Sequence, residues 1–446
     1  MSRPLSLAVV GHTNTGKTSL LRTLLRDSTF GEVRNAAATT RHVEEALISD
    51  GSTPLLKLYD TPGLEDAGGL LDWLESETSA QRDGIERLKI FLESPVAQNE
   101  FSQEAKVLRQ LLASDAALYV IDAREPVLPK YKDELTVLSW CAKPVMPVFN
   151  FTEGRDLSDW HTMLARRNLH VFSSFDTVAF DFDGEMRLWD KLSTMLPPPQ
   201  TLLVQLAQMR RREWSDLNAQ ARLLIAGFLL DLAAYAESCN DAALLPEIQN
   251  RMQQAVREAE QTLHRQLLAL YRFYHSEVDG GEWALRAFSQ DPFDGNLLKQ
   301  YGLRTTRGAA TGALIGLGID TLTAGLSLGL GTALGSVIGG LFPNWQTLSD
   351  KINGVQTVRI DNATLTAMAA RELDLLSVLQ TRGHAAQNGI AAAEGRTPWQ
   401  PENLPPELER ARRHGKWSAL NGHSPASAEA ARAEAAQSLM ARLQAA

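Results

Sequence analysis

Cysteine is nearly absent from this 446-residue chain, which holds two, Cys141 and Cys239. Two cysteines so far apart in sequence provide neither a disulfide framework nor a zinc-ligand pattern, and they fit a reducing cytoplasm. An excess of positive charge is also missing. The formal net charge is −9, which argues against nucleic acid as the main partner of the molecule. The local basic clusters at 210–212 and 410–413 are expected to lie on solvated helix faces.

We expect neither a leader segment nor internal repeats. The chain runs from Met1 through an apolar stretch at 5–10 directly into its first motif, so we expect no signal peptide. Hydrophobic residues make up 44% of the sequence, which excludes global disorder and allows a large core. A chain of this length is expected to form two or three domains.

The first part of the chain alternates strand-like and helix-like segments. A helix is predicted at 17–26, directly after the first strand. The alternation predicts an α/β fold with a mostly parallel sheet flanked by helices. Three prolines at 197–199 mark a boundary, so a first domain is expected over 1–196. Short buried strands are predicted at 5–10, 46–48, 55–59, 116–121 and 145–149.

The remainder of the chain predicts a different organisation. Helical periodicity at 202–237 and 242–275, without a strong strand signal, indicates a helical domain over 200–300. A strand at 357–360 and a helix at 363–380 are expected to pack on this domain, within 346–384. Proline, glycine and alanine dominate from 385 to 446, which we expect to be a loosely ordered tail with a short terminal helix.

A phosphate-binding motif follows the first predicted strand. Residues 11–18 read G-H-T-N-T-G-K-T and fit G-x-x-x-x-G-K-[ST] between a strand and a helix. The glycines let backbone N–H groups face phosphate oxygens, and the helix N-terminus adds a favourable dipole. Lys17 is expected to reach the β- and γ-phosphates, and the Thr18 hydroxyl to ligate Mg²⁺. The residues expected to surround the phosphates are Gly11, His12, Thr13, Asn14, Thr15, Gly16, Lys17, Thr18 and Ser19.

A second motif, Asp60-Thr61-Pro62-Gly63, follows the strand predicted at 55–59. A carboxylate at the end of this strand can hold Mg²⁺ through water, and the N–H of Gly63 can contact the γ-phosphate. Between the two motifs, the loop containing Thr39 and Thr40 can supply a hydroxyl that completes the Mg²⁺ shell. The expected metal ligands are therefore Thr18, Asp60 and a threonine of this loop.

Taken together, these three segments resemble the Era and TrmE branch of the translation-factor-type GTPases. The resemblance implies a G domain that binds GTP with Mg²⁺ and hydrolyses the nucleotide. It also implies that Thr40, just before Arg41, senses Mg²⁺, with Thr39 as the less favoured choice. Beyond the G domain, the chain resembles a bacterial family in which an Era-like GTPase is fused to an uncharacterised helical domain.

The residue after Gly63 is Leu64, where Ras-type enzymes place a glutamine that orients water. A leucine cannot orient water, so assistance must come from elsewhere. In the TrmE-like branch, an asparagine at the position of Asn14 helps to coordinate a monovalent cation. The resemblance thus implies hydrolysis stimulated by K⁺, and the alternative is that Asn14 hydrogen-bonds only within the loop. We expect His12 to pack in the loop rather than act as a base. The expected catalytic residues are Lys17, Thr40, Asn14 and Gly63.

The segment expected to read the base departs from the usual Asn-Lys-x-Asp. After the strand at 145–149 the chain reads Asn150-Phe151-Thr152-Glu153. Glu153 still offers a carboxylate to guanine, and the ring of Phe151 can stack on the base where a lysine would lie along it. The last specificity loop is expected at 181–184, after a strand at 177–180. Guanine is favoured, and adenine remains the alternative.

The segment that follows the second motif is a candidate for regulation. The stretch from Gly63 to Asp115 is long, polar and largely helical, and includes Trp73 and Glu75. It predicts an enlarged switch II region that relays the nucleotide state, with a plain surface insertion as the alternative.

The segment 308–342, within a region we bound at 301–345, has one charged residue, Asp320, and glycines at four-residue spacing. Close-packed helices use such small residues, and the 22 uncharged residues of 321–342 suffice to cross a bilayer. We expect a helical hairpin that inserts into or associates with a membrane, with Asp320 at its turn or near an interface. The alternative is a buried soluble hairpin.

The sequence therefore predicts a GTP-hydrolysing switch at the cytoplasmic face of the inner membrane. Its partners would be a guanine nucleotide and a membrane or membrane protein, and a nucleotide-dependent homodimer through the G domains is a further expectation. Nucleic acid is not favoured. Two alternatives stay open, namely a nucleotide-gated scaffold with little hydrolysis and an ATPase.

Overall fold

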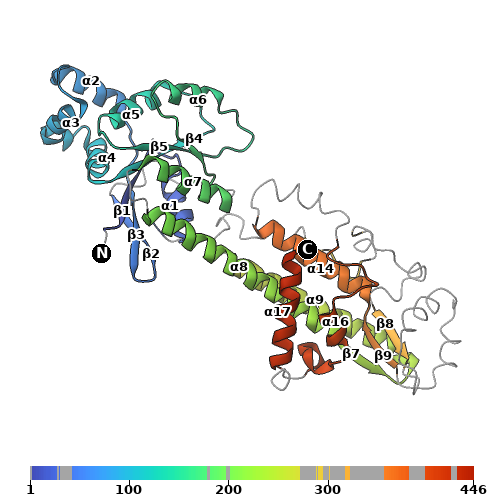
Figure 1. Ribbon diagram of the computed structural model, residues 1–446. Coiled ribbons are helices and arrows are strands. Elements are labelled where there is room, and N and C mark those ends of the chain that lie inside the picture. Colours follow the sequence, from blue (N-terminus) through green and yellow to red (C-terminus); the bar gives the residue numbers. More distant parts are fainter. Residues whose placement is uncertain are drawn as a thin grey trace. The chain divides into compact units, whose positions relative to one another are not determined.

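The computed structural model divides the chain into two compact units (Figure 1). The first unit comprises Met1–Trp214 and Phe273–Val278, and the second comprises Ser215–Arg272 and Asp279–Ala446. The division falls inside one long helix, α8 (Thr201–Ala234). The structure describes residues 3–27, 30, 43–177, 181–196, 201–271, 288, 290–294, 301, 317–321, 356–380, 397–422 and 429–445.

The first unit is built on a six-stranded sheet with the order β2-β3-β1-β4-β5-β6. Neighbouring strands are parallel except for the edge strand β2, which runs antiparallel to β3. Every residue of β4 and β5 is buried, as expected where helices cover both faces of a parallel sheet. The predicted α/β fold is confirmed. The strands are β1 (Leu5–Val10), β2 (Glu44–Asp50), β3 (Thr53–Asp60), β4 (Ala116–Asp122), β5 (Val145–Asn150) and β6 (Ser173–Ser174).

The position predicted for the last strand was wrong. Strand β6 pairs with Val148 and Phe149 of β5, whereas the sequence predicted a strand at 177–180. Thr177 forms a bend, and 178–180 lie outside the described residues. Strand β6 has only two polar residues and is recognised by its pairing with β5. The more apolar run at 177–180 therefore gave a misleading strand signal.

Helices cover the sheet of the first unit on both sides. Figure 1 shows α5 and α6 on one side of β4 and β5, with α7 on the other. The helix predicted at 17–26 is confirmed as α1. The helices are α1 (Lys17–Leu25), α2 (Ala67–Glu77), α3 (Gly84–Glu93), α4 (Ser102–Ala113), α5 (Pro129–Ser139), α6 (Ser158–Ala165) and α7 (Phe182–Met195), with a 3-10 turn η1 (Pro95–Ala97).

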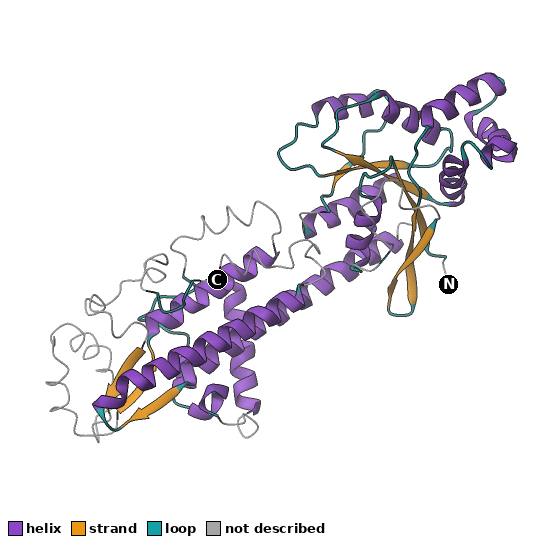
Figure 2. Ribbon diagram, turned by 180° about the vertical axis from the view of Figure 1, so that it is seen from behind, coloured by secondary structure: helices purple, strands orange, loops and turns teal. Residues whose placement is uncertain are grey.

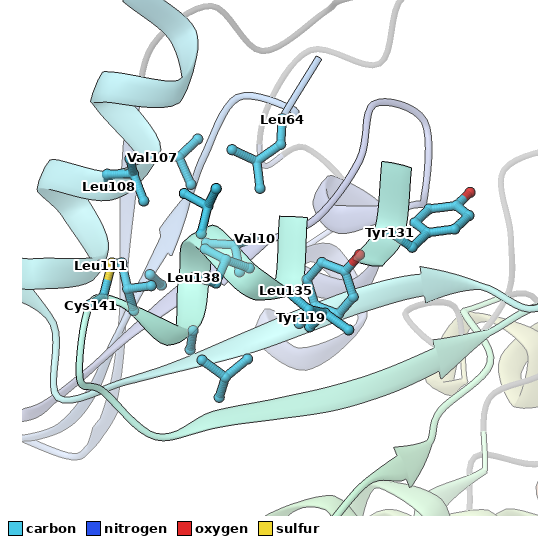
Figure 3. Packing of buried hydrophobic residues seen from close by; sticks show 14 of the residues in the cluster. Val10, Leu64, Val107, Leu108, Leu111, Tyr119, Tyr131, Leu135, Leu138 and Cys141 are labelled. Atoms are coloured by element: carbon cyan, nitrogen blue, oxygen red, sulfur yellow. The ribbon is translucent and has the colours of Figure 1, made fainter. Parts of the chain in front are cut away.

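The core of the first unit lies between its sheet and helices α4 and α5 (Figure 3). Val10 at the end of β1 and Tyr119 of β4 are completely buried, as is Leu108 of α4. Leu64, which directly follows the Asp60–Gly63 motif, belongs to the same cluster and is also completely buried. The segment after β3 is therefore tied to this core by an apolar side chain.

The second unit contains a small antiparallel sheet with the order β7-β9-β8, separate from the sheet of the first unit (Figure 2). The strand and helix predicted near 357–380 are confirmed. The elements are β7 (Ala236–Cys239), η2 (Ala242–Leu244), α9 (Leu245–Leu270), β8 (Leu317–Thr321), β9 (Gln356–Ile360), α14 (Asn362–Gln380), α16 (Pro406–Arg412), η5 (Gly415–Trp417), η6 (Ala419–Asn421) and α17 (Glu429–Ala445).

Strand β7 interrupts a region that the sequence predicted to be wholly helical. Helix α8 ends at Ala234, and β7 pairs with β9, more than a hundred residues further along the chain. The N–H of Ala236 is also bonded to the side chain of Asn421, at 3.3 Å. Long-range partners hold this strand, so local periodicity could not reveal it.

The expectation of a loosely ordered tail was also wrong for the described part of 385–446. Trp417 is 2% exposed, and its carbonyl accepts from Arg432 Nε at 2.9 Å. Leu439 and Leu443 of α17 are buried at helical spacing. An alanine-rich composition suggested weak order, but alanine is the strongest helix former, and two leucines one turn apart suffice to anchor the helix.

One part of the glycine-rich segment is described, and it is a strand. Residues 317–321 form β8, in which Asp320 lies opposite Thr357 of β9. Asp320 is therefore not at the turn of a helical hairpin, because pairing with β9 extends the backbone there. The rest of the membrane segment predicted at 308–342 lies outside the described residues.

Among the described helices, α8 alone is long and apolar enough to cross a membrane by length and composition, and half of its most apolar window is buried within the structure. Core helices of soluble proteins share these features.

The two basic clusters expected on solvated faces are partly buried. Arg210 is 4% exposed and donates to the carbonyl of Leu24 at 2.7 Å. Arg412 donates to the carbonyl of Ile360 at 2.8 Å and to the side-chain oxygen of Asn362 at 2.7 Å. A guanidinium can satisfy several acceptors at once, so these arginines join segments that are distant in sequence.

Candidate nucleotide-binding site

The loop from Gly11 to Gly16 connects β1 to α1 in a backbone conformation that depends on its residue types. Gly11 has φ 147°, Asn14 has φ 65° and Gly16 has φ 89°. A Cβ at Gly11 would lie 2.5 Å from the carbonyl oxygen of Val120, so glycine is required there. Asparagine tolerates the left-handed region at position 14. The loop therefore takes the curled form that the motif predicted.

Lys17, the first residue of α1, folds back over the loop. Its Nζ donates to the carbonyl of Gly11 at 3.1 Å and to that of His12 at 2.7 Å, and the residue is 7% exposed. Burial lowers the pKa of Lys17 to about 8, although Asp60 and Glu134 oppose this shift. A nearby anion would favour the ammonium form and raise this pKa again. Lys17 is thus a buried cation whose ammonium group is bonded to two backbone carbonyls.

Thr18 and Asp60 are in direct contact, although 42 residues separate them. The Thr18 hydroxyl donates to Asp60 Oδ2 at 2.6 Å. Asp60 ends β3, is 1% exposed, and has its pKa raised to about 6 by burial. Its other oxygen, Oδ1, is buried without a hydrogen-bond partner.

These two side chains fit Mg²⁺. A hydroxyl and a carboxylate with an unpartnered oxygen offer the hard oxygen donors that this ion prefers, beside a loop shaped for phosphate. Two of the three predicted metal ligands are therefore together. Thr40, the third, lies outside the described residues, as do Thr39 and Arg41.

The Asp60–Gly63 segment lies against the phosphate-binding loop. A Cβ on Gly63 would lie 2.7 Å from the backbone nitrogen of Thr13. The next residue, Leu64, donates its N–H to the carbonyl of Gly11 at 3.2 Å, while its side chain points into the core (Figure 3). Leu64 therefore links the two motifs through its backbone, and its side chain cannot orient a water.

His12 contacts a buried glutamate that sequence reasoning missed. Its Nδ1 lies 2.8 Å from Glu134 Oε1, and Glu134 Oε2 accepts from the Tyr119 hydroxyl at 2.6 Å. Glu134 belongs to α5 and is 1% exposed. The packing role expected for His12 agrees with these contacts. No local signal marks Glu134, because a glutamate within an amphipathic helix is usually solvated.

Asn150, at the end of β5, connects the phosphate-binding loop to the loop after β6. Its Nδ2 donates to the carbonyl of Thr15 at 3.1 Å. Its Oδ1 accepts from Thr177 N at 3.0 Å, from Thr177 Oγ1 at 3.1 Å and from Phe151 N at 3.0 Å. The side chain therefore holds two loops of the site in place.

The residues beside Asn150 form an aromatic and charged group. Phe151 has φ 57°, and the guanidinium of Arg124 stacks 3.9 Å from the centre of its ring. Arg124 also donates to both carboxylate oxygens of Asp122, at 2.6 Å for the closest pair. Glu153 lies in an exposed turn next to this group. Arg124 and Asp122 were not identified from the sequence, because they follow a different strand, β4.

The specificity loop predicted at 181–184 was wrong. Asp181 caps α7 by accepting from Asp183 N at 3.0 Å, and Phe182 begins the helix. The loop beside Asn150 is the one that follows β6. In that loop, Asp176 accepts from the N–H of Thr152 at 3.2 Å. The misplaced strand at 177–180 explains the error, because it moved the expected loop toward α7.

The long segment after Gly63 forms helices α2, α3 and α4, as its polar helical pattern predicted, and Trp73 and Glu75 lie in α2. Its beginning is anchored by Glu104 of α4, which is 3% exposed. One oxygen of Glu104 accepts from the N–H groups of Glu65 and Asp66, both at 2.9 Å. The insertion is thus connected to the Asp60–Gly63 motif by backbone hydrogen bonds.

Known proteins similar to the first unit are GTPases. Residues 6–151 match the family described as "50S ribosome-binding GTPase". The tRNA modification GTPase MnmE of Staphylococcus haemolyticus is 29% identical over 123 residues, covering 27% of this chain and 26% of that protein. MnmE of Streptococcus gordonii is 30% identical over 133 residues, covering 30% and 22%. The chain thus spans about a quarter of the length of these relatives.

Two solved structures are also similar. Era of Aquifex aeolicus bound to GDP·AlF₄⁻ is 18% identical with a TM-score of 0.31, covering 44% of this chain and 58% of that one. The G domain of the T. maritima FeoB iron transporter is 18% identical with a TM-score of 0.27, covering 43% and 99%. Residues 161–441 match the family described as "Domain of unknown function (DUF3482)". The chain belongs to this family, and it joins the family's C-terminal domain to a P-loop GTPase domain with Era and MnmE neighbours.

Proposed function

We propose that the first unit binds GTP together with Mg²⁺ and hydrolyses it, so that the protein works as a molecular switch. The observation that carries this proposal is the contact between Thr18 and Asp60, which leaves Asp60 Oδ1 buried and unpartnered beside the phosphate-binding loop. A buried carboxylate oxygen without a partner is costly unless a ligand satisfies it.

Each residue of the site has a distinct role in this proposal. The amides of residues 11–19 bind the phosphate oxygens, and Lys17 leaves its two carbonyl partners to neutralise the β- and γ-phosphates. Thr18, Asp60 and Thr40 hold Mg²⁺, which supplies positive charge to the phosphate oxygens. The N–H of Gly63 contacts the γ-phosphate. The position of Gly63 against Thr13 supports this last role.

Guanine is the base that the site is proposed to bind. The relatives of the first unit are named as GTPases, which supports guanine over adenine. Asn150 holds the base-side loops in position, and the ring of Phe151, supported by Arg124, offers a face for stacking. Glu153 accepts from the guanine N–H groups. These contacts take the place of the usual lysine and aspartate.

A monovalent cation held by Asn14 is proposed to assist hydrolysis. Asn14 is exposed and makes no hydrogen bond within the described part of the chain, which disfavours the alternative of a purely internal role. The buried side chain of Leu64 leaves the usual water-orienting position without a polar group. A cation beside the transferred phosphoryl group would supply the charge that an arginine provides in other enzymes.

Phosphate release in steady state tests hydrolysis, base choice and cation together. We expect turnover of GTP rather than ATP, with faster release in K⁺ than in Na⁺. Asn14→Ala should abolish the stimulation by K⁺. The rate of GTP hydrolysis in K⁺ should then fall by a factor of roughly 100, which is the loss expected when one contact to the developing negative charge is removed. Asn99→Ala, an exposed asparagine on the same unit, should retain it.

The outcomes separate the alternatives clearly. GTP binding without release of phosphate would favour a nucleotide-gated scaffold, and release from ATP would favour an ATPase. Equal rates in K⁺ and Na⁺ would remove Asn14 from the mechanism. The absence of Mg²⁺-dependent binding of either nucleotide would overturn the proposal as a whole.

The second unit is proposed to act as the effector, at the cytoplasmic face of the inner membrane. The support is the composition of 321–342, which carries no charged residue and regularly spaced glycines. Pairing of two G domains during hydrolysis is proposed as a further feature, with no nucleic acid required.

Flotation with vesicles of mixed zwitterionic and anionic phospholipids tests the membrane proposal. A variant lacking 322–342 keeps strand β8 and should lose flotation, while the full chain floats. If the shortened variant still floats, this segment is not the anchor. If the full chain fails to float in both the GDP-bound and the GTP-bound state, membrane association through this segment is excluded.

A further inference from the structure

A buried group of two glutamates and a histidine lies inside the second unit, on helices α9 and α14. Glu260 and His264 are four residues apart and share one face of α9, and Glu372 comes from α14. One ligand atom from each residue can be chosen so that all three lie within 4.8 Å of one another. Figure 1 labels both helices, which belong to the second unit.

All three side chains are removed from solvent. Glu260 is 4% exposed, His264 is 5% exposed and Glu372 is 0% exposed. Polar groups this deeply buried are normally satisfied by directed hydrogen bonds, and each one that is not requires a reason. The contacts within this group are incomplete in two places.

The first incomplete contact is at His264. Its Nε2 lies 3.1 Å from one oxygen of Glu372 and 3.0 Å from the other. The two oxygens share a single ring nitrogen, so the contact is bifurcated and leaves further lone pairs on the carboxylate. It also brings a nitrogen and two carboxylate oxygens to a common point.

The second incomplete contact is at Glu260. Its Oε1 is buried and makes no hydrogen bond, although Arg371 Nε lies 2.9 Å away in an ion pair. Glu260 and Glu372 also adjoin each other, and burial together with that second carboxylate raises the pKa of Glu260. Two adjacent buried carboxylates require either a shared proton or a cation between them.

Arg371 supplies a positive charge beside Glu260, but its guanidinium also bonds to backbone carbonyls. Its Nη2 donates to the carbonyls of Phe288 and Gln290, the latter at 2.8 Å. One guanidinium thus faces two carboxylates. A divalent cation could accept lone pairs from the two carboxylates and from the imidazole at the same time.

We propose that Glu260, His264 and Glu372 bind a divalent transition-metal ion, of the class of Zn²⁺ or Mn²⁺, which joins α9 to α14. An imidazole nitrogen with carboxylate oxygens is a donor set that these ions accept. Mg²⁺ is a poorer fit, because it prefers oxygen ligands alone. The complete burial of the site makes the ion a structural component of the second unit.

Metal content and thermal unfolding of the nucleotide-free full chain test the proposal. After removal of metals with a chelator, Zn²⁺ or Mn²⁺ should return to one ion per chain and raise the unfolding temperature, and Mg²⁺ should not. Because no nucleotide is present, the result does not depend on the proposed GTPase activity.

Neutral substitutions of the same size locate the ion. Glu260→Gln and Glu372→Gln should each weaken binding by more than the ~100-fold seen when supporting groups around a metal are changed. Glu258→Gln is the matched control, because Glu258 is exposed on the same helix two residues before Glu260. It should bind like the unchanged chain.

A result on the unchanged chain decides the matter even if a variant fails to fold. Visible absorption of bound Co²⁺ should show coordination by nitrogen and oxygen, with intensity that saturates at one ion. The proposal is wrong if the unchanged chain takes up no stoichiometric ion and its unfolding temperature does not rise when Zn²⁺ or Mn²⁺ is added. In that case a shared proton, and not a metal ion, links the two glutamates. Stoichiometric binding that both Glu260→Gln and Glu372→Gln retain would equally overturn the proposal.

Discussion

The two units bury charge in different ways. In the first unit, Lys17 at the start of α1 and Asp60 at the end of β3 lie beside a curled loop, where a ligand can arrive and leave. In the second unit, Glu260 of α9 and Glu372 of α14 form a group with His264, and all three residues are buried. Both sites hold a carboxylate oxygen without a hydrogen bond.

The difference indicates what kind of ligand each site suits. A loop rich in backbone N–H groups makes many moderate contacts to an anion, which suits a ligand that is exchanged in each cycle. Side chains that converge from two packed helices suit an ion that stays in place, because reaching it requires the helices to separate. The following predictions test this contrast, beginning with the largest expected effect.

Lys17→Ala should weaken nucleotide affinity by at least about 100-fold, because a charge-assisted contact to the phosphates is lost. The same change should leave the free energy of unfolding, measured without nucleotide and Mg²⁺, unchanged or higher. Lys17 is a buried cation, and its desolvation destabilises the folded state. Calorimetric titration with GTP and Mg²⁺ measures the first effect and urea unfolding the second. Lys132→Ala, on the exposed face of α5, is the control. Undiminished affinity in Lys17→Ala would place the phosphates elsewhere.

Arg210→Ala tests a buried charged group that needs no ligand. Glu185 of α7 is completely buried and pairs with Arg26 Nη2 at 3.0 Å and with Arg210 Nε at 3.5 Å. Removing Arg210 also frees the carbonyl of Leu24, so we expect a loss of about 3 kcal/mol in the free energy of unfolding. Urea unfolding measures it, with the exposed Arg211→Ala as control. Equal stability of the two variants would show that Arg26 and Trp189 satisfy Glu185 without Arg210.

The first unit could be predicted well from sequence because its site is encoded locally. The glycines at 11 and 16, Lys17 and Asp60 each carry their role within a few residues of a strand end, and the structure brings them together. Strand β2 and its neighbours could also be predicted, because their sequences are short apolar runs bounded by polar residues. The parts that were missed within this unit, Glu134 and Glu104, act through tertiary contacts with no local pattern.

The second unit could not be predicted in the same way. Its sheet joins β7 to β9 across a long sequence separation, and its buried glutamate group joins residues 108 positions apart. Neither Glu260 nor Glu372 differs from a surface glutamate by its neighbours in sequence. Composition also misled in the tail, where Trp417 and Arg432 form specific contacts within an alanine-rich stretch.

Asp60→Asn should change how stability depends on pH. Burial raises the pKa of Asp60 to about 6 in the folded chain, above its ordinary value of 3.8. The folded state therefore binds a proton more readily, and this contribution to stability is present below pH 3.8 and lost as the pH rises through 6. It amounts to about 2–3 kcal/mol for a shift of this size.

Nucleotide-free Asp60→Asn should consequently lose this pH dependence and be the more stable form at pH 7. Urea unfolding of both proteins between pH 4 and pH 7 measures the effect, and addition of GTP with Mg²⁺ should reverse the order of stability. A difference between the two proteins that stays constant across this range would mean that Asp60 is already paired in the absence of ligand.

The smallest effect is expected at the base, where stacking replaces the usual lysine. Phe151 is supported on one side by Arg124, 3.9 Å from its ring centre, so its ring is held rigidly and loses little freedom on binding. Phe151→Ala should weaken GTP and ATP binding by a similar amount, about 1 kcal/mol or fivefold, because every base has a face to stack. Phe151→Leu keeps the apolar bulk and separates stacking from burial. Loss of affinity for GTP alone would mean instead that Phe151 positions Glu153 for guanine, so that this part of the site reads the identity of the base.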